Sequence, residues 1–324
     1  MALLAGCTDP RLFKTMEGHT IQDLEVSPDG QQLLIAECET SKDNYPSPPD
    51  RWSVRLCESE TGRELKRLDF PASRVAYASD GTVALCSSWE IAHWDPRKCG
   101  EPIRIRSKAP VKDVAWLPAN RQLVSAGKGG IRLWNIETRE MERLWREEEV
   151  QGIAVSADGQ RLVAYVGSKG RNRNSIHVWD LETRQILHEL TGYNYNYRLA
   201  GLAISSDGTT AVAGMEDGRN TAWDTATGEK LQTMYGVGKV CDSAISPDGQ
   251  KVLAANGIRS GGPMTGGGKN SLFLWDVATG KISRRLAVFS NKTSLSKVAF
   301  SPDGRFVLAV VKKEEIHRWN LSRD

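Results

Sequence analysis

One stretch of the chain holds the signals that decide the fold: residues 201–230 read GLAISSDGTTAVAGMEDGRNTAWDTATGEK. A turn sequence, Ser206-Asp207-Gly208, separates two short apolar runs, and a third run ends in Trp223-Asp224 before Thr227-Gly228. A glycine between apolar runs indicates a hairpin turn because it accepts positive φ, and the proline of fuller copies presets φ. The stretch therefore predicts short strands joined by tight turns.

The same words recur along the chain, which indicates an internal repeat. An aromatic residue followed by Asp or Asn occurs six times, and a degenerate seventh copy precedes them: Leu56-Cys57-Glu58, His93-Trp94-Asp95, Leu133-Trp134-Asn135, Val178-Trp179-Asp180, Ala222-Trp223-Asp224, Leu274-Trp275-Asp276 and Arg318-Trp319-Asn320. Counted from Cys57, successive copies are 37, 40, 45, 44, 52 and 44 residues apart. The turn word alternates with them: Ser27-Pro28-Asp29-Gly30, Ser79-Asp80-Gly81, Leu117-Pro118-Ala119-Asn120, Ser156-Ala157-Asp158-Gly159, Ser206-Asp207-Gly208, Ser246-Pro247-Asp248-Gly249 and Ser301-Pro302-Asp303-Gly304.

Short apolar runs fill the intervals between these words, at 123–124, 131–134, 162–166, 211–213 and 307–311. Four short strands in a unit of about 40–45 residues is the period of a β-propeller blade. Runs that are apolar on both faces suit blades covered on both sides by their neighbours. The sequence therefore predicts an all-β, seven-bladed β-propeller.

With these words in register, the chain resembles the WD-repeat (WD40) propeller family over residues 11–321, and its dense Ser-Pro-Asp-Gly turns resemble bacterial members. The resemblance implies that the ring closes non-covalently. Only residues 321–324 follow the last aromatic-acid word, Trp319-Asn320, too few for a fourth strand, so we expect residues 11–16 to supply the outer strand of the last blade. We expect a short tail at 1–10 and a single propeller at 11–324.

The resemblance also implies a polar network that is mostly missing here. Relatives often carry Gly-His before a blade, with the histidine bonded to Asp, Ser or Thr and to the tryptophan. This sequence keeps only Gly18-His19, whose blade has Cys57 in place of tryptophan. Apolar packing must therefore hold the blades together.

Bulk properties favour a soluble protein in a reducing compartment. Of 324 residues, 40% are hydrophobic and 26% charged, and the net charge is +3, too small to indicate nucleic acid by itself. Six scattered cysteines fit a cytoplasmic location. Leu4-Ala5-Gly6-Cys7 resembles a lipoprotein box, but only six residues, none basic, precede Cys7. A lipid-anchored or periplasmic location is the alternative, and we expect no membrane span.

Motifs for catalysis are missing from the sequence. The five histidines show no metal-ligand spacing, and no Gly-x-Ser-x-Gly elbow occurs. Lys269 follows a glycine-rich segment, but Asn270 stands where a phosphate loop needs Ser or Thr. We therefore expect no cofactor, no metal and no enzyme. The alternative is a lactonase-like propeller hydrolase.

Departures from the minimal repeat mark the expected binding surface, because function in repeat folds concentrates on such loops. Loops at 39–51, 167–175 and 256–270 lengthen blades one, four and six, and 193–198 enters blade five. The resemblance to WD-repeat propellers implies that all four lie on one rim. Tyrosine and arginine are enriched in binding hot spots. The candidate partner contacts are Tyr45, Arg51, Lys169, Arg171, Arg173, Tyr193, Tyr195, Tyr197, Arg198 and Arg259. The alternative is that alternating Tyr-Asn extends a strand and packs its rings between blades.

These observations predict a non-catalytic scaffold, or a sensor or regulatory subunit, that binds a protein partner through these loops within a multi-protein complex. We expect the chain alone to be monomeric. Basic residues beside aromatic ones also suit single-stranded nucleic acid, the less favoured partner.

Overall fold

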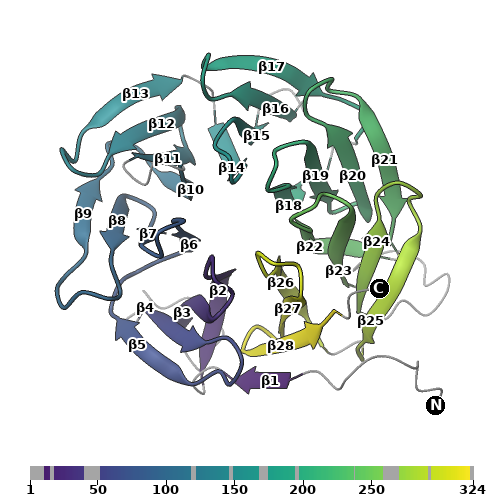
Figure 1. Ribbon diagram of the computed structural model, residues 1–324, viewed down its shortest axis with the longest axis horizontal. Helices are drawn as coiled ribbons and strands as arrows, with labels where there is room; N and C mark the ends of the chain where they lie inside the picture. Colours follow the sequence, from purple (N-terminus) through teal and green to yellow (C-terminus); the bar gives the residue numbers. More distant parts are fainter. Residues whose placement is uncertain are drawn as a thin grey trace.

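Strands alone build the molecule. The computed structural model describes residues 11–14, 18–39, 52–117, 122–145, 149–167, 174–193, 197–236, 238–257, 270–290 and 293–321. Within them lie 28 strands and no helix, arranged as seven four-stranded antiparallel sheets around a central axis (Figure 1). The predicted seven-bladed β-propeller is confirmed.

Each blade runs from an inner strand at the axis to an outer strand at the circumference. The first four blades consist of β2 (His19–Val26), β3 (Gln32–Glu39), β4 (Trp52–Glu58) and β5 (Glu64–Leu68); β6 (Arg74–Tyr77), β7 (Val83–Cys86), β8 (Glu90–Trp94) and β9 (Ile103–Arg106); β10 (Val111–Trp116), β11 (Gln122–Gly127), β12 (Gly130–Asn135) and β13 (Met141–Trp145); and β14 (Glu149–Val155), β15 (Arg161–Gly167), β16 (Ser175–Asp180) and β17 (Gln185–Leu190). The last three consist of β18 (Leu199–Ile204), β19 (Thr210–Met215), β20 (Arg219–Asp224) and β21 (Lys230–Tyr235); β22 (Lys239–Ile245), β23 (Lys251–Gly257), β24 (Ser271–Asp276) and β25 (Ile282–Val288); and β26 (Leu295–Phe300), β27 (Phe306–Val311), β28 (Glu315–Asn320) and β1 (Arg11–Lys14).

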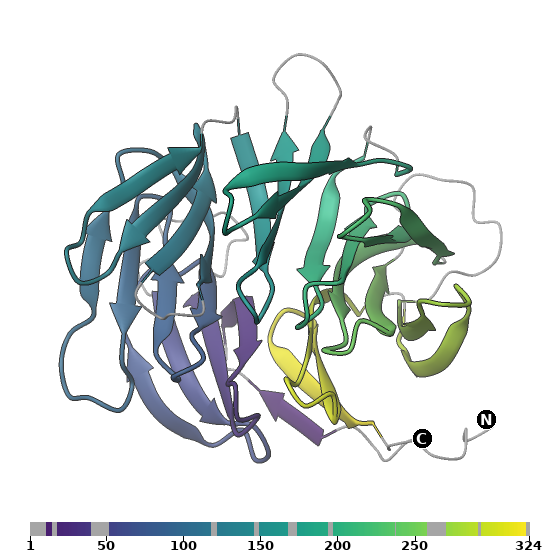
Figure 2. The same cartoon turned by 45° about the horizontal axis from the view of Figure 1, so that its top comes forward.

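Strand β1 closes the ring as predicted. It pairs antiparallel with β28, with Leu12 opposite His317 and Phe13 opposite Ile316, and the two strands lie side by side in Figures 1 and 2. The guanidinium of Arg318 also donates to the carbonyl of Ser59 in blade one at 2.8 Å. This pairing covers the edge that β28 would otherwise expose.

The turn word has a physical basis that the seventh blade shows. Ser301 Oγ donates to Asp303 Oδ1 at 2.6 Å, and the backbone N–H of Arg305 donates to the same oxygen at 3.0 Å. Gly304 takes φ +69°, where a side chain would be strained. The same Ser–Asp hydrogen bond forms in blades one, four, five and six, so the recurring word is a recurring hydrogen-bonded turn.

The aromatic-acid word combines packing with a second turn. Asp276 Oδ1 accepts hydrogen bonds from the N–H and the hydroxyl of Thr279, which fixes the hairpin to the outer strand. The preceding tryptophans are buried in apolar clusters between adjacent blades, and Trp223 is fully buried. Trp134 Nε1 donates to Ser125 Oγ at 2.8 Å, whereas the indole nitrogens of Trp179 and Trp275 have no hydrogen-bond partner in the described part of the chain. Apolar packing is therefore the main contact between blades.

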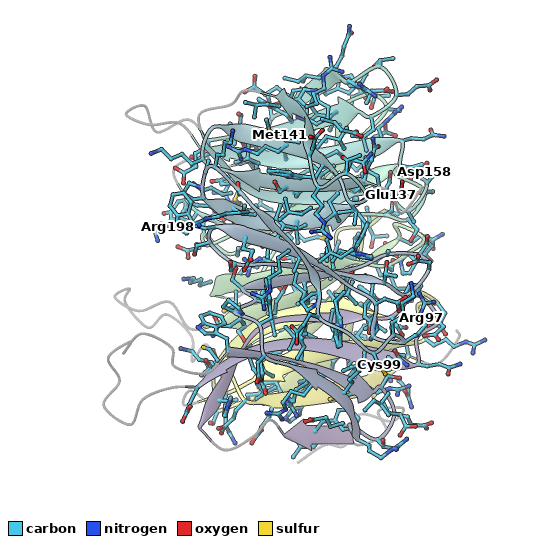
Figure 3. All side chains as sticks on the ribbon, turned by 90° about the vertical axis from the view of Figure 1, so that its left-hand side faces the viewer. Arg97, Cys99, Glu137, Met141, Asp158 and Arg198 are labelled. Atoms are coloured by element: carbon cyan, nitrogen blue, oxygen red, sulfur yellow. The ribbon has the colours of Figure 1, made fainter. Side chains whose placement is uncertain are left out.

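The two rims of the ring differ in which loops they carry. We call the rim that holds the turn words the bottom rim. The top rim holds the loops between the second and third strands of a blade and the loops that enter each blade. In Figure 3, Asp158 and Arg97 lie toward one edge of the ring and Arg198 at the opposite edge.

Candidate functional site

The long loops singled out by the sequence leave from the top rim. They connect β3 to β4, β15 to β16 and β23 to β24, and a fourth enters blade five after β17. Seven of the ten candidate partner contacts lie outside the described residues: Tyr45, Arg51, Lys169, Arg171, Arg173, Tyr195 and Arg259. The flanking strands agree with the predicted loop positions, and the binding role of these seven residues stays a prediction.

Tyr193 is an internal residue of the top rim. Its side chain is 7% exposed, and its ring meets Trp223 edge to face with centroids 5.9 Å apart. Its hydroxyl donates to the carbonyl of Asn174 at 2.8 Å. The ring therefore packs between blades four and five, which is the alternative interpretation of the Tyr-Asn segment, and its direct contact with a partner stays a prediction.

Tyr197 and Arg198 lie closer to the surface of the same loop. Tyr197 is partly exposed, and its carbonyl accepts a hydrogen bond from the hydroxyl of Tyr165 at 3.4 Å. Arg198 is exposed, and its carbonyl accepts the N–H of Glu216 at 3.0 Å. These backbone contacts fix the loop to blades four and five while the Arg198 side chain extends outward (Figure 3).

Two exposed aromatic residues on the top rim were missed by the sequence reasoning. Trp89 stands in the turn between β7 and β8 with 53% of its surface exposed, and Tyr235 ends β21 with 67% exposed. The guanidinium of Arg219 lies 5.7 Å from the Tyr235 ring centroid. A signal existed for Trp89, since it falls outside every aromatic-acid word and follows two serines.

Basic side chains accompany Trp89. The Trp89 carbonyl accepts the N–H of Ser107 at 2.9 Å, which sets the turn beside the end of β9. Arg106 and Lys108, on either side of Ser107, are both exposed. This corner of the top rim therefore combines one large aromatic surface with positive charge.

A ring of charged residues in the central channel was also missed. One position recurs in each inner strand, four residues before the bottom turn, and holds in blade order Asp23, Arg74, Asp113, Gly152, Gly201, Asp242 and Lys297. The strand register shifts at or just before this position in β2, β10, β14, β18, β22 and β26. Such bulges redirect side chains. We call these seven positions the channel ring.

The aspartates of the channel ring connect neighbouring blades. Asp23 Oδ2 accepts the N–H of Val75 at 3.1 Å, and Asp113 Oδ2 accepts the N–H of Ile153 at 2.9 Å. Asp242 Oδ2 accepts the N–H of Val298 at 3.0 Å. Each carboxylate thus satisfies an N–H on the inner edge of the following blade, where no further strand is available to pair with it.

Positive side chains of the channel ring partly neutralise its aspartates. Lys297 Nζ lies 3.5 Å from Asp23 Oδ1, and Arg74 Nε lies 3.9 Å from Asp113 Oδ1. Burial would lower the pKa of Lys297, but Asp242 and Asp23 outweigh it, so the pKa is raised and the ammonium is retained. Burial raises the pKa of Asp113 and of Asp242, although nearby cations and N–H donors oppose the rise.

Glu25 lies below the channel ring, and its carboxyl has a raised pKa. Burial raises its pKa from the ordinary 4.5 to about 8, against the hydrogen bond that the Tyr77 N–H donates to Oε2 at 2.5 Å. The charges of Asp23 and Asp113 add to the rise. Glu25 is therefore largely protonated at neutral pH.

The channel contains a cavity of about 580 Å³ beneath the ring. Its lining runs from Asp23, Asp113 and Asp242 down to Pro28 and Pro302 in the bottom turns. In the part of the chain that the structure describes, no group of three or more His, Cys, Asp or Glu side chains is placed to hold a metal ion. Among the described residues, there is no helix long and apolar enough to cross a membrane. Fold and site together define a seven-bladed β-propeller with an aromatic top rim and a charged channel.

One part of the sequence matches a known type of repeat. Residues 100–135 match the family model "WD domain, G-beta repeat". They cover the outer strand of blade two and the first three strands of blade three, including the hydrogen-bonded pair Ser125 and Trp134. The chain therefore carries a WD repeat, the type of propeller unit that its sequence resembles.

Curated relatives extend the similarity over most of the chain. Apoptotic protease-activating factor 1 of Rattus norvegicus is 26% identical over 250 residues, 73% of this chain and 18% of the relative. Cell division cycle 20.6, cofactor of APC complex, of Arabidopsis thaliana is 24% identical over 288 residues, 83% of this chain and 62% of the relative. WD repeat-containing protein slp1 of Schizosaccharomyces pombe is 22% identical over 64% of this chain and 41% of its own length. The chain thus spans less than two thirds of each of these proteins.

Proposed function

We propose that the chain is a non-catalytic scaffold or regulatory subunit that binds a protein partner through its top rim, as part of a multi-protein complex. One observation carries the proposal: a rigid, closed ring exposes Trp89 and Tyr235 on its top rim, 53% and 67% accessible. Large exposed aromatic residues supported by arginine are typical of binding hot spots. The similarity to a cofactor of a protein complex supports the same function.

The rim has the anatomy that a protein interface needs. The backbone beneath Trp89 is held by the β7–β8 turn and by Ser107, so little ordering entropy is lost when a partner covers the ring. Arg106 and Lys108 add positive charge beside it, which favours a partner segment that carries acidic residues. Arg198, exposed on blade five, extends the surface around the rim.

The proposal also covers the cellular location of the protein and its oligomeric state. The described cysteines Cys38, Cys57, Cys86, Cys99 and Cys241 are all free thiols, which supports a cytoplasmic protein in a reducing compartment. We propose that the chain is monomeric until its partner binds, and that its dense turn words reflect a bacterial origin.

Affinity purification from the native host, read by quantitative mass spectrometry, tests the function. The rim variant carries Trp89→Ala and Tyr235→Ala. The matched control carries Leu65→Ala and Met141→Ala, which remove two side chains of similar exposure, 41% and 45%, from the outer strands instead of the rim. Both variants are first shown to unfold at the wild-type temperature.

A partner that binds the rim should be recovered with wild type and with the control, and lost with the rim variant. Removing one hot-spot residue costs about 2 kcal/mol of binding free energy, which weakens binding by roughly 30-fold. Removing both weakens it further. Equal recovery by both variants would show that the partner binds elsewhere on the propeller. Purification without a partner, combined with turnover of an ester or lactone, would favour a hydrolase.

A further inference from the structure

Three segments of the top rim meet beside Trp89, and hydrogen bonds hold them together. In the turn between β7 and β8, the Trp89 carbonyl accepts the N–H of Ser107 at 2.9 Å. The segment that contains Ser107 leads into blade three, where the Pro110 carbonyl accepts the N–H of Lys128 at 3.2 Å. Backbones joined by such bonds lie about 5 Å apart. Side chains from all three segments are therefore close enough to meet one ligand.

The exposed cations of these segments have no carboxylate partner. They are Arg106, Lys108 and Lys128. None of them forms an ion pair with a described residue. The carboxylates nearby already have partners, because Glu90 pairs with Arg104 at 3.3 Å and Glu149 pairs with Lys112 at 2.6 Å. This part of the rim therefore carries an excess of positive charge.

The rim beside Tyr235, the other exposed aromatic residue, is different. Arg219 pairs there with Asp217 at 3.2 Å, and Lys239 pairs with Glu216 at 2.7 Å. Positive charge thus does not run unbroken around the described rim, as a groove for single-stranded nucleic acid would require. A short anionic segment fits the Trp89 side better than a long polyanion does.

A fourth cation, Arg132, lies buried beneath the exposed ones. It is 6% exposed, and it shares a face of β12 with Trp134, which packs against blade two. Its Nη2 donates to the Lys128 carbonyl at 2.6 Å, and its Nη1 donates to the Gly130 carbonyl at 3.5 Å. A Cβ on Gly129 would lie 3.3 Å from Nη2. The guanidinium therefore sits at the β11–β12 turn, on the top rim.

Arg132 has no counter-ion. Among the described residues one other arginine is as buried, Arg55, and its Nε lies 3.0 Å from Glu37 Oε1. Arg132 meets carbonyl oxygens instead, and burial lowers its pKa with no nearby carboxylate to oppose the change. An arginine keeps its charge in proteins, and a buried charge without a counter-ion carries a free-energy penalty. An anion from outside the chain would remove that penalty.

Five residues make up what we call the basic corner: Trp89, Arg106, Lys108, Lys128 and Arg132. We infer that the basic corner binds an oxyanion carried by a segment of the protein partner, either the phosphate of a phosphorylated side chain or the carboxylate of Asp or Glu. Charge-assisted hydrogen bonds from the exposed cations hold the oxyanion above Arg132, and an apolar neighbour in the segment covers the Trp89 ring. The inference rests on the proposed function, since the partner supplies the anion.

Magnetic resonance of the isotope-labelled full chain tests the site. The indole N–H signal of Trp89, assigned by its loss in Trp89→Phe, reports binding. The probes are short capped glycine peptides with a central phosphoserine, glutamate or serine, and a short oligothymidylate. One corner variant combines Lys108→Gln with Lys128→Gln, and the other is Arg132→Gln, which keeps a donor for the Lys128 carbonyl. The control variant combines Lys230→Gln with Lys281→Gln, two exposed lysines near the bottom turns.

We expect the phosphoserine or the glutamate peptide to shift the Trp89 signal in wild type and in the control variant. Each corner variant should bind about ten-fold more weakly, as when one charged hydrogen bond is lost. A preference for phosphoserine identifies a phosphate, and equal or tighter binding of the glutamate peptide identifies a carboxylate. The inference is overturned if no peptide binds, if serine binds as well, if oligothymidylate binds more tightly than any peptide, or if both corner variants bind undiminished. The exposed lysine pair keeps the test decisive should Arg132→Gln fail to fold.

Affinity purification with the lysine variant separates this inference from the proposed function. A partner that is lost with Trp89→Ala and Tyr235→Ala, yet recovered fully with Lys108→Gln and Lys128→Gln, would overturn the oxyanion site and leave the top-rim function intact. Loss of the partner with both variants supports the two together.

Discussion

Replacing Glu25 by glutamine should stabilise the propeller at alkaline pH and leave its stability at pH 5 nearly unchanged. The substitution keeps an oxygen that accepts the Tyr77 N–H, which Oε2 accepts at 2.5 Å in the native protein. The other carboxyl oxygen, with its titrating proton, is replaced by an amide NH₂ that does not titrate. Any pH-dependent difference between the two proteins therefore reports on the ionisation of this one carboxyl.

The magnitude follows from the difference between the folded and the ordinary pKa. Burial raises the pKa of Glu25 from 4.5 to about 8, so below pH 4.5 the carboxyl is protonated in both the folded and the unfolded chain. Between these values the folded state holds a proton that the unfolded state releases, and stability falls as pH rises through the folded pKa. At 1.36 kcal/mol per pH unit the full difference is about 5 kcal/mol. Glu25 lines the channel cavity and is only partly buried, so solvent screening reduces this figure, and we expect about 2 kcal/mol.

Urea unfolding at pH 5, 7 and 9, followed by tryptophan fluorescence, measures the effect. The free energy of unfolding of Glu25→Gln should exceed that of wild type by about 2 kcal/mol at pH 9, by less at pH 7, and by close to zero at pH 5. Glu137→Gln, an exposed change of the same kind, should follow wild type throughout. A constant difference between Glu25→Gln and wild type at all three pH values would refute a raised carboxyl pKa.

Three further changes probe the fold. Deleting residues 1–16 removes β1 and leaves β28 as an open edge, so the variant should aggregate; an undiminished cooperative melt would contradict closure by β1. Gly201→Ala should lower the melting temperature far more than Gly152→Ala, because only at Gly201 does a Cβ meet neighbouring backbone at 2.4 Å; equal melting temperatures would contradict this contact. Trp134→Phe should cost about 1 kcal/mol more in urea unfolding than Trp275→Phe, since only the Trp134 indole makes a hydrogen bond; equal costs would show that this bond contributes nothing.

The architecture could be predicted because its signals are local and repeated. Each turn word fixes its own hairpin through bonds between residues two to five positions apart, as Ser301 and Asp303 show, and so it can be recognised without the rest of the chain. The same holds for the Asp276 turn. Closure was predicted by counting strands. The last blade has only three strands from the C-terminal end of the sequence, so its fourth strand was expected from the N-terminal end.

The functional surfaces could not be predicted in the same way because they are assembled from distant positions. Asp23, Asp113 and Asp242 lie in three different blades, and no recurring local motif marks the position that each occupies in its inner strand. Long loops drew attention to the top rim, but loop length does not fix exposure. Tyr193 turned inward onto Trp223, while Trp89, in one of the shortest turns, remained 53% exposed.

The pairing of β1 with β28 also sets the order of events on the ribosome. The two strands are about 300 residues apart in the chain, and the earlier one emerges first. At about 5–20 residues per second, β1 waits roughly 15–60 s before β28 exists. Six blades can form during that interval, but the ring stays an open arc whose first and last blades each leave one apolar face uncovered. Protection of these faces during synthesis, by a chaperone or by the partner itself, therefore bears on the yield of this protein as directly as the stability of the finished ring.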